Sequence, residues 1–71
     1  MRKRHHTKII HEGEYVAEVA VELIDPDEGW SPYLSLDDAL KLDEVREALR
    51  EGALKKAAKI SHVFTLIPVA V

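Results

Sequence analysis

An alternation of side chains over residues 15–24 constrains the fold of this chain more than any other feature. Every second position is apolar and would face one side of an extended strand: Tyr15, Ala17, Val19, Val21 and Leu23. The opposite side carries Glu18 and Glu22 among apolar neighbours. This period of two predicts a β-strand with one face in a hydrophobic core and the other at least partly in water. Such one-sided strands are typical of antiparallel sheets.

Turn residues on both sides of this strand predict further strands. Residues 8–11 form a short strand before a tight turn at residues 12–14, where Gly13 tolerates positive φ. Residues 25–29 have the Asp, Pro and Gly residues of a loop. A third strand follows over residues 30–34, and Pro32 confines it to an edge or to a short length. Residues 63–67 form a final strand that ends at Pro68.

Helical signals fill the segment between the third and final strands. Ser35 can cap a helix whose first turn carries Asp37 and Asp38. Two apolar groups follow on roughly opposite sides of that helix, one around Leu36 and Leu40, the other around residues 42–49. We expect a break near residues 42–43 and a second helical stretch that ends at Gly52, and the alternative is one helix buried on two sides. A further short helix is predicted over residues 53–60.

These elements predict an α+β fold: a three-stranded antiparallel meander, then two or three short helices, then a C-terminal strand. Residues 8–71 would form a single domain. Residues 1–7 are expected to be a disordered basic tail, because no apolar residue follows Met1 there. The core is expected where the strand and helix faces converge, at Tyr15, Val19, Val21, Leu23, Leu49, Leu54, Phe64 and Leu66.

Composition limits how such a domain can be stabilised. With 46% hydrophobic and 32% charged residues in 71, the chain has enough apolar residues to fold, but only one modest core. It contains no cysteine, so neither a disulfide nor a thiolate metal site can add stability. An oligomer or a permanent partner could do so. No apolar run is long enough to cross a bilayer, and the basic start lacks the apolar segment of a secretory signal, so we expect a cytoplasmic protein.

Charge is distributed in three blocks along the chain. Residues 1–8 carry four lysines and arginines and no acid, and residues 12–44 carry eleven acids against one lysine. Residues 45–71 carry five lysines and arginines against two acids. The sum is the net charge of -3. The acidic middle block favours a partner with a basic surface.

The sequence contains no pattern that indicates catalysis. His5, His6, His11 and His62 match no defined metal site, so no metal is expected. The three glycines are isolated and form no phosphate-binding loop, so no nucleotide cofactor is expected. The acids stand on a strand face, in a turn and at helix starts, and the free serines stand in no nucleophile motif. We therefore expect a protein that is not an enzyme.

A protein-binding role is the function that these features favour. The expected contact residues are the acids of the strand and loop with the neighbouring aromatic rings: Glu18, Glu22, Asp25, Asp27, Glu28, Trp30 and Tyr33. One alternative is nucleic-acid binding through the basic residues Arg2, Lys3, Arg4, Arg46, Arg50, Lys55, Lys56 and Lys59. The other is a structural homodimer that pairs strand edges.

The predicted elements run in the order strand, strand, strand, helix, strand. The second strand opens with Gly13-Glu14-Tyr15-Val16-Ala17-Glu18-Val19, and the helix opens with Ser35-Leu36-Asp37-Asp38-Ala39-Leu40. In this order and these two motifs, residues 8–50 resemble the HicB-like antitoxin domain. The resemblance implies a small bacterial protein that neutralises a partner toxin, often a ribonuclease, by covering its active surface.

Overall fold

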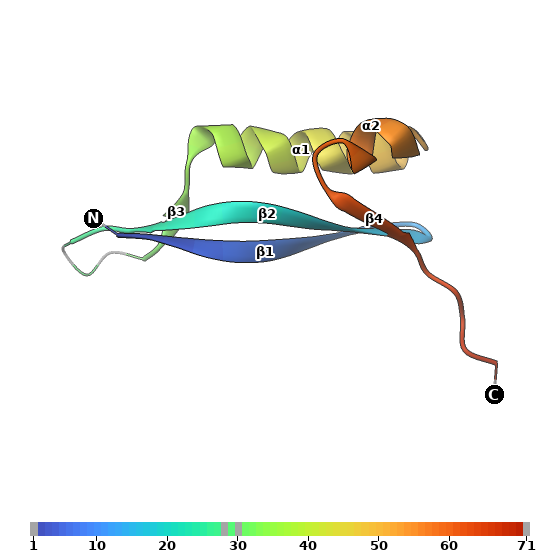
Figure 1. Ribbon diagram of the computed structural model, residues 1–71, viewed down its shortest axis with the longest axis horizontal. Helices are drawn as coiled ribbons and strands as arrows, with labels where there is room; N and C mark the ends of the chain where they lie inside the picture. Colours follow the sequence, from blue (N-terminus) through green and yellow to red (C-terminus); the bar gives the residue numbers. More distant parts are fainter. Residues whose placement is uncertain (1, 28, 30, 71) are drawn as a thin grey trace.

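The predicted alternating strand is the centre of the sheet. The computed structural model describes residues 2–27, 29 and 31–70. In it, β2 (Tyr15–Asp25) pairs antiparallel with β1 (Arg2–Glu12) along its whole length, from Glu12 opposite Tyr15 to Arg2 opposite Asp25. Gly13, at φ 61°, allows the tight turn between the two strands. Two short strands pair with the other edge of β2: β3 (Tyr33–Leu34) at one end and β4 (His62–Thr65) at the other. This antiparallel sheet with its helices confirms the predicted α+β class (Figure 1).

The first strand is longer than the sequence indicated. Residues 2–7, expected to be a disordered tail, form the first half of β1, so that expectation is wrong for these residues, and Met1 lies outside the described part. The reason is that the second half of β2 offers its backbone groups as a template for pairing, in a register continuous with the rest of the hairpin. Arg4 also forms an ion pair with Asp25 of β2, with Nε and Oδ2 2.7 Å apart.

Side chains of the first helix fill a gap in the sheet. Between β4 and β3, no strand among the described residues lies beside residues 19–22 of β2 on that edge. There the N–H of Glu22 donates to Oδ2 of Asp38 at 2.9 Å, and Nζ of Lys41 donates to the carbonyl oxygen of Ala20 at 2.6 Å. Two helix side chains thus satisfy backbone groups that a strand would otherwise pair.

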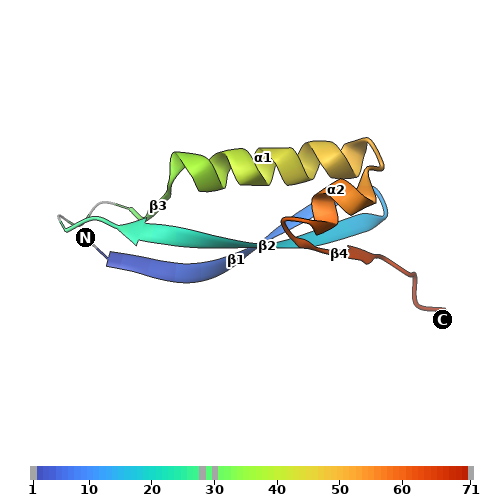
Figure 2. The same cartoon turned by 45° about the horizontal axis from the view of Figure 1, so that its top comes forward.

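One continuous helix, α1 (Leu36–Arg50), follows β3, so the predicted break near residues 42–43 is wrong. Ser35 caps it as expected, its Oγ accepting from the N–H of Asp38 at 3.1 Å. The helix buries the group that includes Val45 and Leu49 and leaves Leu36 73% exposed, so it is not buried on two sides either. After Gly52, the short helix α2 (Leu54–Ala58) packs beside α1 on the same face of the sheet (Figure 2).

The core lies between that sheet face and the two helices. Its buried residues are Ile10, Ala17, Val19, Val21, Val45, Ala48, Leu49 and Ala57. Val19, Val21 and Leu49 were predicted, and Tyr15 and Leu54 are half-buried against the cluster. Phe64 and Leu66 were predicted wrongly, since both are exposed. The largest fully buried side chains are only valines, Val19 and Val45, so this core is thin.

Candidate functional site

The sheet has a second face that no helix of the described residues covers. The core residues of β2 are the odd-numbered ones, so its even-numbered residues point away from the helices. The pairing register then defines which residues of the other strands share their side. The uncovered face consists of Lys3, His5, Thr7, Ile9, His11, Val16, Glu18, Ala20, Glu22, Ile24, Tyr33, His62 and Phe64. Figure 1 shows both helices on one side of the sheet and the other side bare.

Apolar side chains gather at both ends of this uncovered face. Phe64 lies directly opposite Val16, and Ile9 is the diagonal neighbour of Val16 on the other strand. Ile9 is 58% exposed and Phe64 51% exposed. At the far end Ile24 lies opposite Tyr33, which is 48% exposed. Large apolar side chains on one face that no other layer covers are characteristic of an interaction surface.

The centre of the uncovered face is polar and carries two carboxylates. Glu18 lies opposite His62 of β4, and Glu22 lies opposite His5 of β1. Both carboxylates stand on the central strand and are half-buried. The face therefore combines apolar ends with an acidic middle that is bordered by histidines.

Three of the predicted partner-binding residues share this face, and the others do not. Glu18, Glu22 and Tyr33 lie on it. Asp25 lies on the helix side and is held by Arg4. Asp27 is exposed in the loop after β2. The predictions for Glu28 and Trp30 fall outside the described residues.

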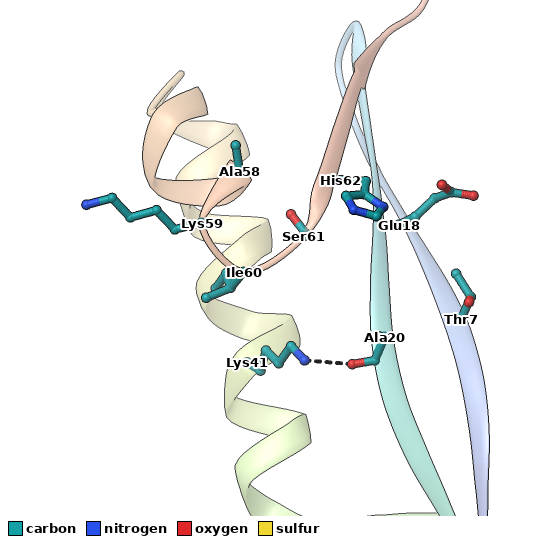
Figure 3. Close-up of a pocket in the computed structure, with 9 residues that line it drawn as sticks. All are labelled: Thr7, Glu18, Ala20, Lys41, Ala58, Lys59, Ile60, Ser61 and His62. Carbon is teal, nitrogen blue, oxygen red and sulfur yellow. Dashed lines mark hydrogen bonds between the residues drawn. The ribbon is translucent and has the colours of Figure 1, made fainter.

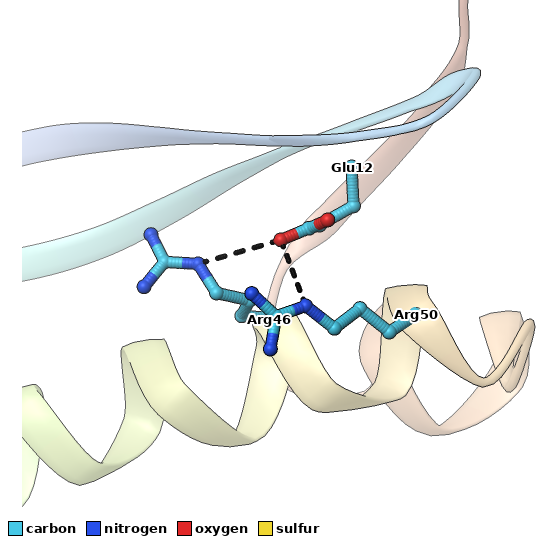
Figure 4. A network of polar contacts seen from close by, with 3 residues as sticks. All are labelled: Glu12, Arg46 and Arg50. Atoms are coloured by element: carbon cyan, nitrogen blue, oxygen red, sulfur yellow. Dashed lines mark hydrogen bonds and ion pairs between the residues drawn. The ribbon is translucent and has the colours of Figure 1, made fainter.

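The basic residues of the nucleic-acid alternative are divided among separate surfaces. Arg46 and Arg50 both reach Glu12 at the end of β1, with Nε to Oε1 distances of 3.7 and 3.1 Å (Figure 4). Lys55, Lys56 and Lys59 are exposed on and just after α2, and Arg2, Lys3 and Arg4 lie on β1. Because Glu12 neutralises part of the charge of the two helix arginines, residues 46–59 do not form one continuous cationic strip.

A groove opens at the gap between β4 and β3, where Ser61, His62, Glu18 and Lys41 are among the lining residues (Figure 3). Two of its polar side chains, Ser61 and Lys41, have structural partners. The Ser61 hydroxyl donates to the carbonyl oxygen of Ala57 at 2.6 Å, and Lys41 is bonded to Ala20 across the gap. The hydroxyl is thus occupied in closing the end of α2, and the ammonium group in supporting the sheet edge.

Over the part of the chain that the structure describes, no cluster of three or more His, Cys, Asp or Glu side chains could hold a metal ion. Within the same residues, no helix is long and apolar enough to span a bilayer.

Sequence reasoning missed Ile9 and Phe64 as surface residues. Both are large and apolar, which made Phe64 a core candidate, and only the register with β2 shows that they face away from the helices. The signal was present in residues 62–65, where Val63 and Phe64 alternate and only one of them can face the core. The chain continues past β4 with exposed apolar residues, Ile67 and Val69, on a segment that extends away from the sheet in Figure 1.

The comparisons with known proteins add no relative. No family model matches the chain, and no curated protein or solved structure shows significant similarity to it. The function must therefore be argued from the residues and their arrangement.

Proposed function

We propose that this chain is a non-catalytic protein-binding module whose docking surface is the uncovered sheet face. The observation that carries the proposal is the exposure of Ile9, Phe64 and Tyr33 on the face opposite the helices. Covering such side chains removes apolar surface from water at roughly 25 cal/mol per Å². A partner that docks there would complete a second packed layer on a domain whose own core is thin.

The carboxylates at the centre of the face define the kind of partner. Glu18 and Glu22 would be placed within the contact, so a partner with a basic surface would neutralise them. This charge pattern agrees with the resemblance to HicB-like antitoxin domains, which implies a toxin partner of the ribonuclease type. On that reading the module neutralises a basic bacterial toxin by direct contact in the cytoplasm.

The test is affinity purification from the native host, identification of the bound protein, and binding kinetics with that purified partner. Phe64→Ser and Ile9→Ser should mainly speed dissociation, because they remove apolar contact area. Glu18→Lys with Glu22→Lys should mainly slow association and flatten its salt dependence. Leu40→Ser and Glu47→Lys are matched controls, since they change an exposed apolar and an acidic residue of α1 instead.

The proposal would be contradicted if the variants of the uncovered face and the α1 controls changed the binding kinetics equally. Recovery of nucleic acid alone, with affinity lost on replacing Lys55, Lys56 and Lys59, would favour the nucleic-acid alternative. A ribonuclease assay on the recovered partner, with and without this protein, tests the antitoxin reading separately.

A further inference from the structure

The outer edge of β1 is an eleven-residue strand edge with no strand beside it among the described residues. Its hydrogen-bonding groups can be assigned from the other side of the sheet. Glu22 N–H and Ala20 C=O of β2 bond to α1, so the even-numbered residues of β2 direct their backbone groups away from β1. The odd-numbered residues of β2 therefore bond to their even-numbered partners on β1. It follows that Lys3, His5, Thr7, Ile9 and His11 direct their N–H and C=O groups outward.

The two edges of the sheet differ in whether other groups cover them. The edge of β2 that faces away from β1 is covered by β3, by β4 and, between them, by the side chains of Asp38 and Lys41. The β1 edge has no such cover from the described residues, although it is eleven residues long. A long unpaired edge is a template for another extended segment.

The charge of β1 selects which segment can pair. Arg2, Lys3 and Lys8 are exposed and form no ion pair with a described residue. The one acid of the strand, Glu12, is already held by Arg46 and Arg50. Pairing with the β1 strand of a second copy would bring together four lysines and arginines from each chain, which like-charge repulsion opposes.

We propose that the β1 edge binds an extended acidic segment of a partner protein as an added strand. The alternating outward N–H and C=O groups fit a peptide backbone, which offers both acceptors and donors. The phosphodiester groups of a nucleic acid offer only acceptors and cannot pair with the carbonyl groups of β1. Acidic side chains on the added strand would lie across from the free cations of β1. This inference uses the outward backbone groups of β1, whose odd-numbered side chains also lie on the uncovered face, and it does not rest on the proposed function.

The probe is a synthetic peptide of about ten residues in which glutamate alternates with threonine, so that it can lie extended beside β1. A control peptide of the same sequence carries methyl groups on its backbone nitrogens, so its backbone cannot donate hydrogen bonds. We expect the unmethylated peptide to bind at least about tenfold more tightly, the equivalent of one or two net hydrogen bonds. On binding, amide exchange should slow at the odd-numbered residues of β1 and change little at the even-numbered ones, which already pair with β2.

A matched pair of variants tests the same edge from the protein side. Thr7→Pro removes one outward N–H, which an edge strand tolerates, and Thr7→Ala keeps it. Only Thr7→Pro should weaken binding of the unmethylated peptide, and melting curves confirm that both variants fold. Equal binding of the two peptides, or exchange protection without the odd-numbered pattern, would overturn the inference. The inference would be overturned in favour of nucleic acid if a single-stranded oligonucleotide bound as tightly as the peptide and Thr7→Pro did not affect that binding. If the peptide did not bind at all, the inference would also be overturned, and the cations of β1 would serve only to protect the edge from pairing. The peptide comparison decides the matter even if Thr7→Pro does not fold.

Discussion

At the scale of single residues, two large apolar side chains that look alike in the sequence have opposite roles. Leu49 is buried between α1 and the sheet, while Phe64 projects from the uncovered face and is half exposed. Leu49→Ala should lower the free energy of unfolding by about 2–5 kcal/mol, because it leaves a cavity in a small core. Phe64→Ala should cost less than about 1 kcal/mol in the isolated protein. Urea denaturation of the two variants measures both values.

The neighbouring residue supplies a control for Phe64. Val63 lies on the helix side of β4, packed against the core. Val63→Ala should therefore cost more than Phe64→Ala, although it removes a smaller side chain. A larger loss for Phe64→Ala would mean that its ring is packed in the free protein, which would remove the main support for the proposed docking surface.

At the scale of secondary-structure elements, α1 also acts as part of the sheet edge. Asp38→Ala leaves the N–H of Glu22 without its acceptor and should cost about 1–3 kcal/mol. Asp37→Ala is the matched control, because it stands in the same first turn and loses a similar helix-dipole interaction, but it is exposed. Amide exchange at Glu22 should quicken in Asp38→Ala and not in Asp37→Ala. Equal stability of the two variants would show that water accepts the hydrogen bond of the Glu22 N–H as well as the Asp38 carboxylate does.

The first half of β1 gives a second prediction at this scale. Because residues 2–7 pair with β2 from Ala20 to Asp25, deleting them exposes that half of the central strand. We expect the deletion to lower the melting temperature by more than about 5 °C, as a loss of about 1 kcal/mol would in a domain of this size. In the full-length protein, the amides of Arg4 and His6, which face β2, should exchange slowly. Rapid exchange at both positions would restore the interpretation of a disordered tail.

These elements also show how far the sequence could predict the structure. The sequence could predict the strand at residues 15–24, the Ser35 cap and the α+β class, because each depends on a local pattern. It could not predict the pairing of residues 2–7, because their polar side chains carry no strand signal and β2 supplies the template. The single helix was missed because the exposed Leu36 conflicts with the rule that apolar residues are buried. Of the candidate site, the sequence placed Glu18 and Glu22 on one face, but Ile9 and Phe64 required the register.

At the scale of the whole molecule, the fold is a two-layer arrangement in which only one sheet face is packed. The molecule measures 48 × 30 × 14 Å, and Figure 1, a view down the shortest axis, shows the helix layer stacked on one side of the sheet. A chain of this size buries only about 60% of the surface that its unfolded form exposes. Binding at the uncovered face would therefore also stabilise the fold, because any ligand of the native state raises its stability.

Whether that ligand is a second copy or another protein can be predicted from the charge of the face. Self-docking would bring Glu18 and Glu22 of one copy toward the same carboxylates of the other, which like-charge repulsion disfavours. We therefore expect the isolated protein to scatter light as a monomer at micromolar concentration, with a melting temperature independent of protein concentration. Phe64→Ser should leave the monomeric state and the melting temperature unchanged, and it should increase the solubility of the protein. A melting temperature that rises with concentration in the unmodified protein but not in Phe64→Ser would show instead that a second copy covers the face, since only a native-state oligomer links stability to concentration in this way.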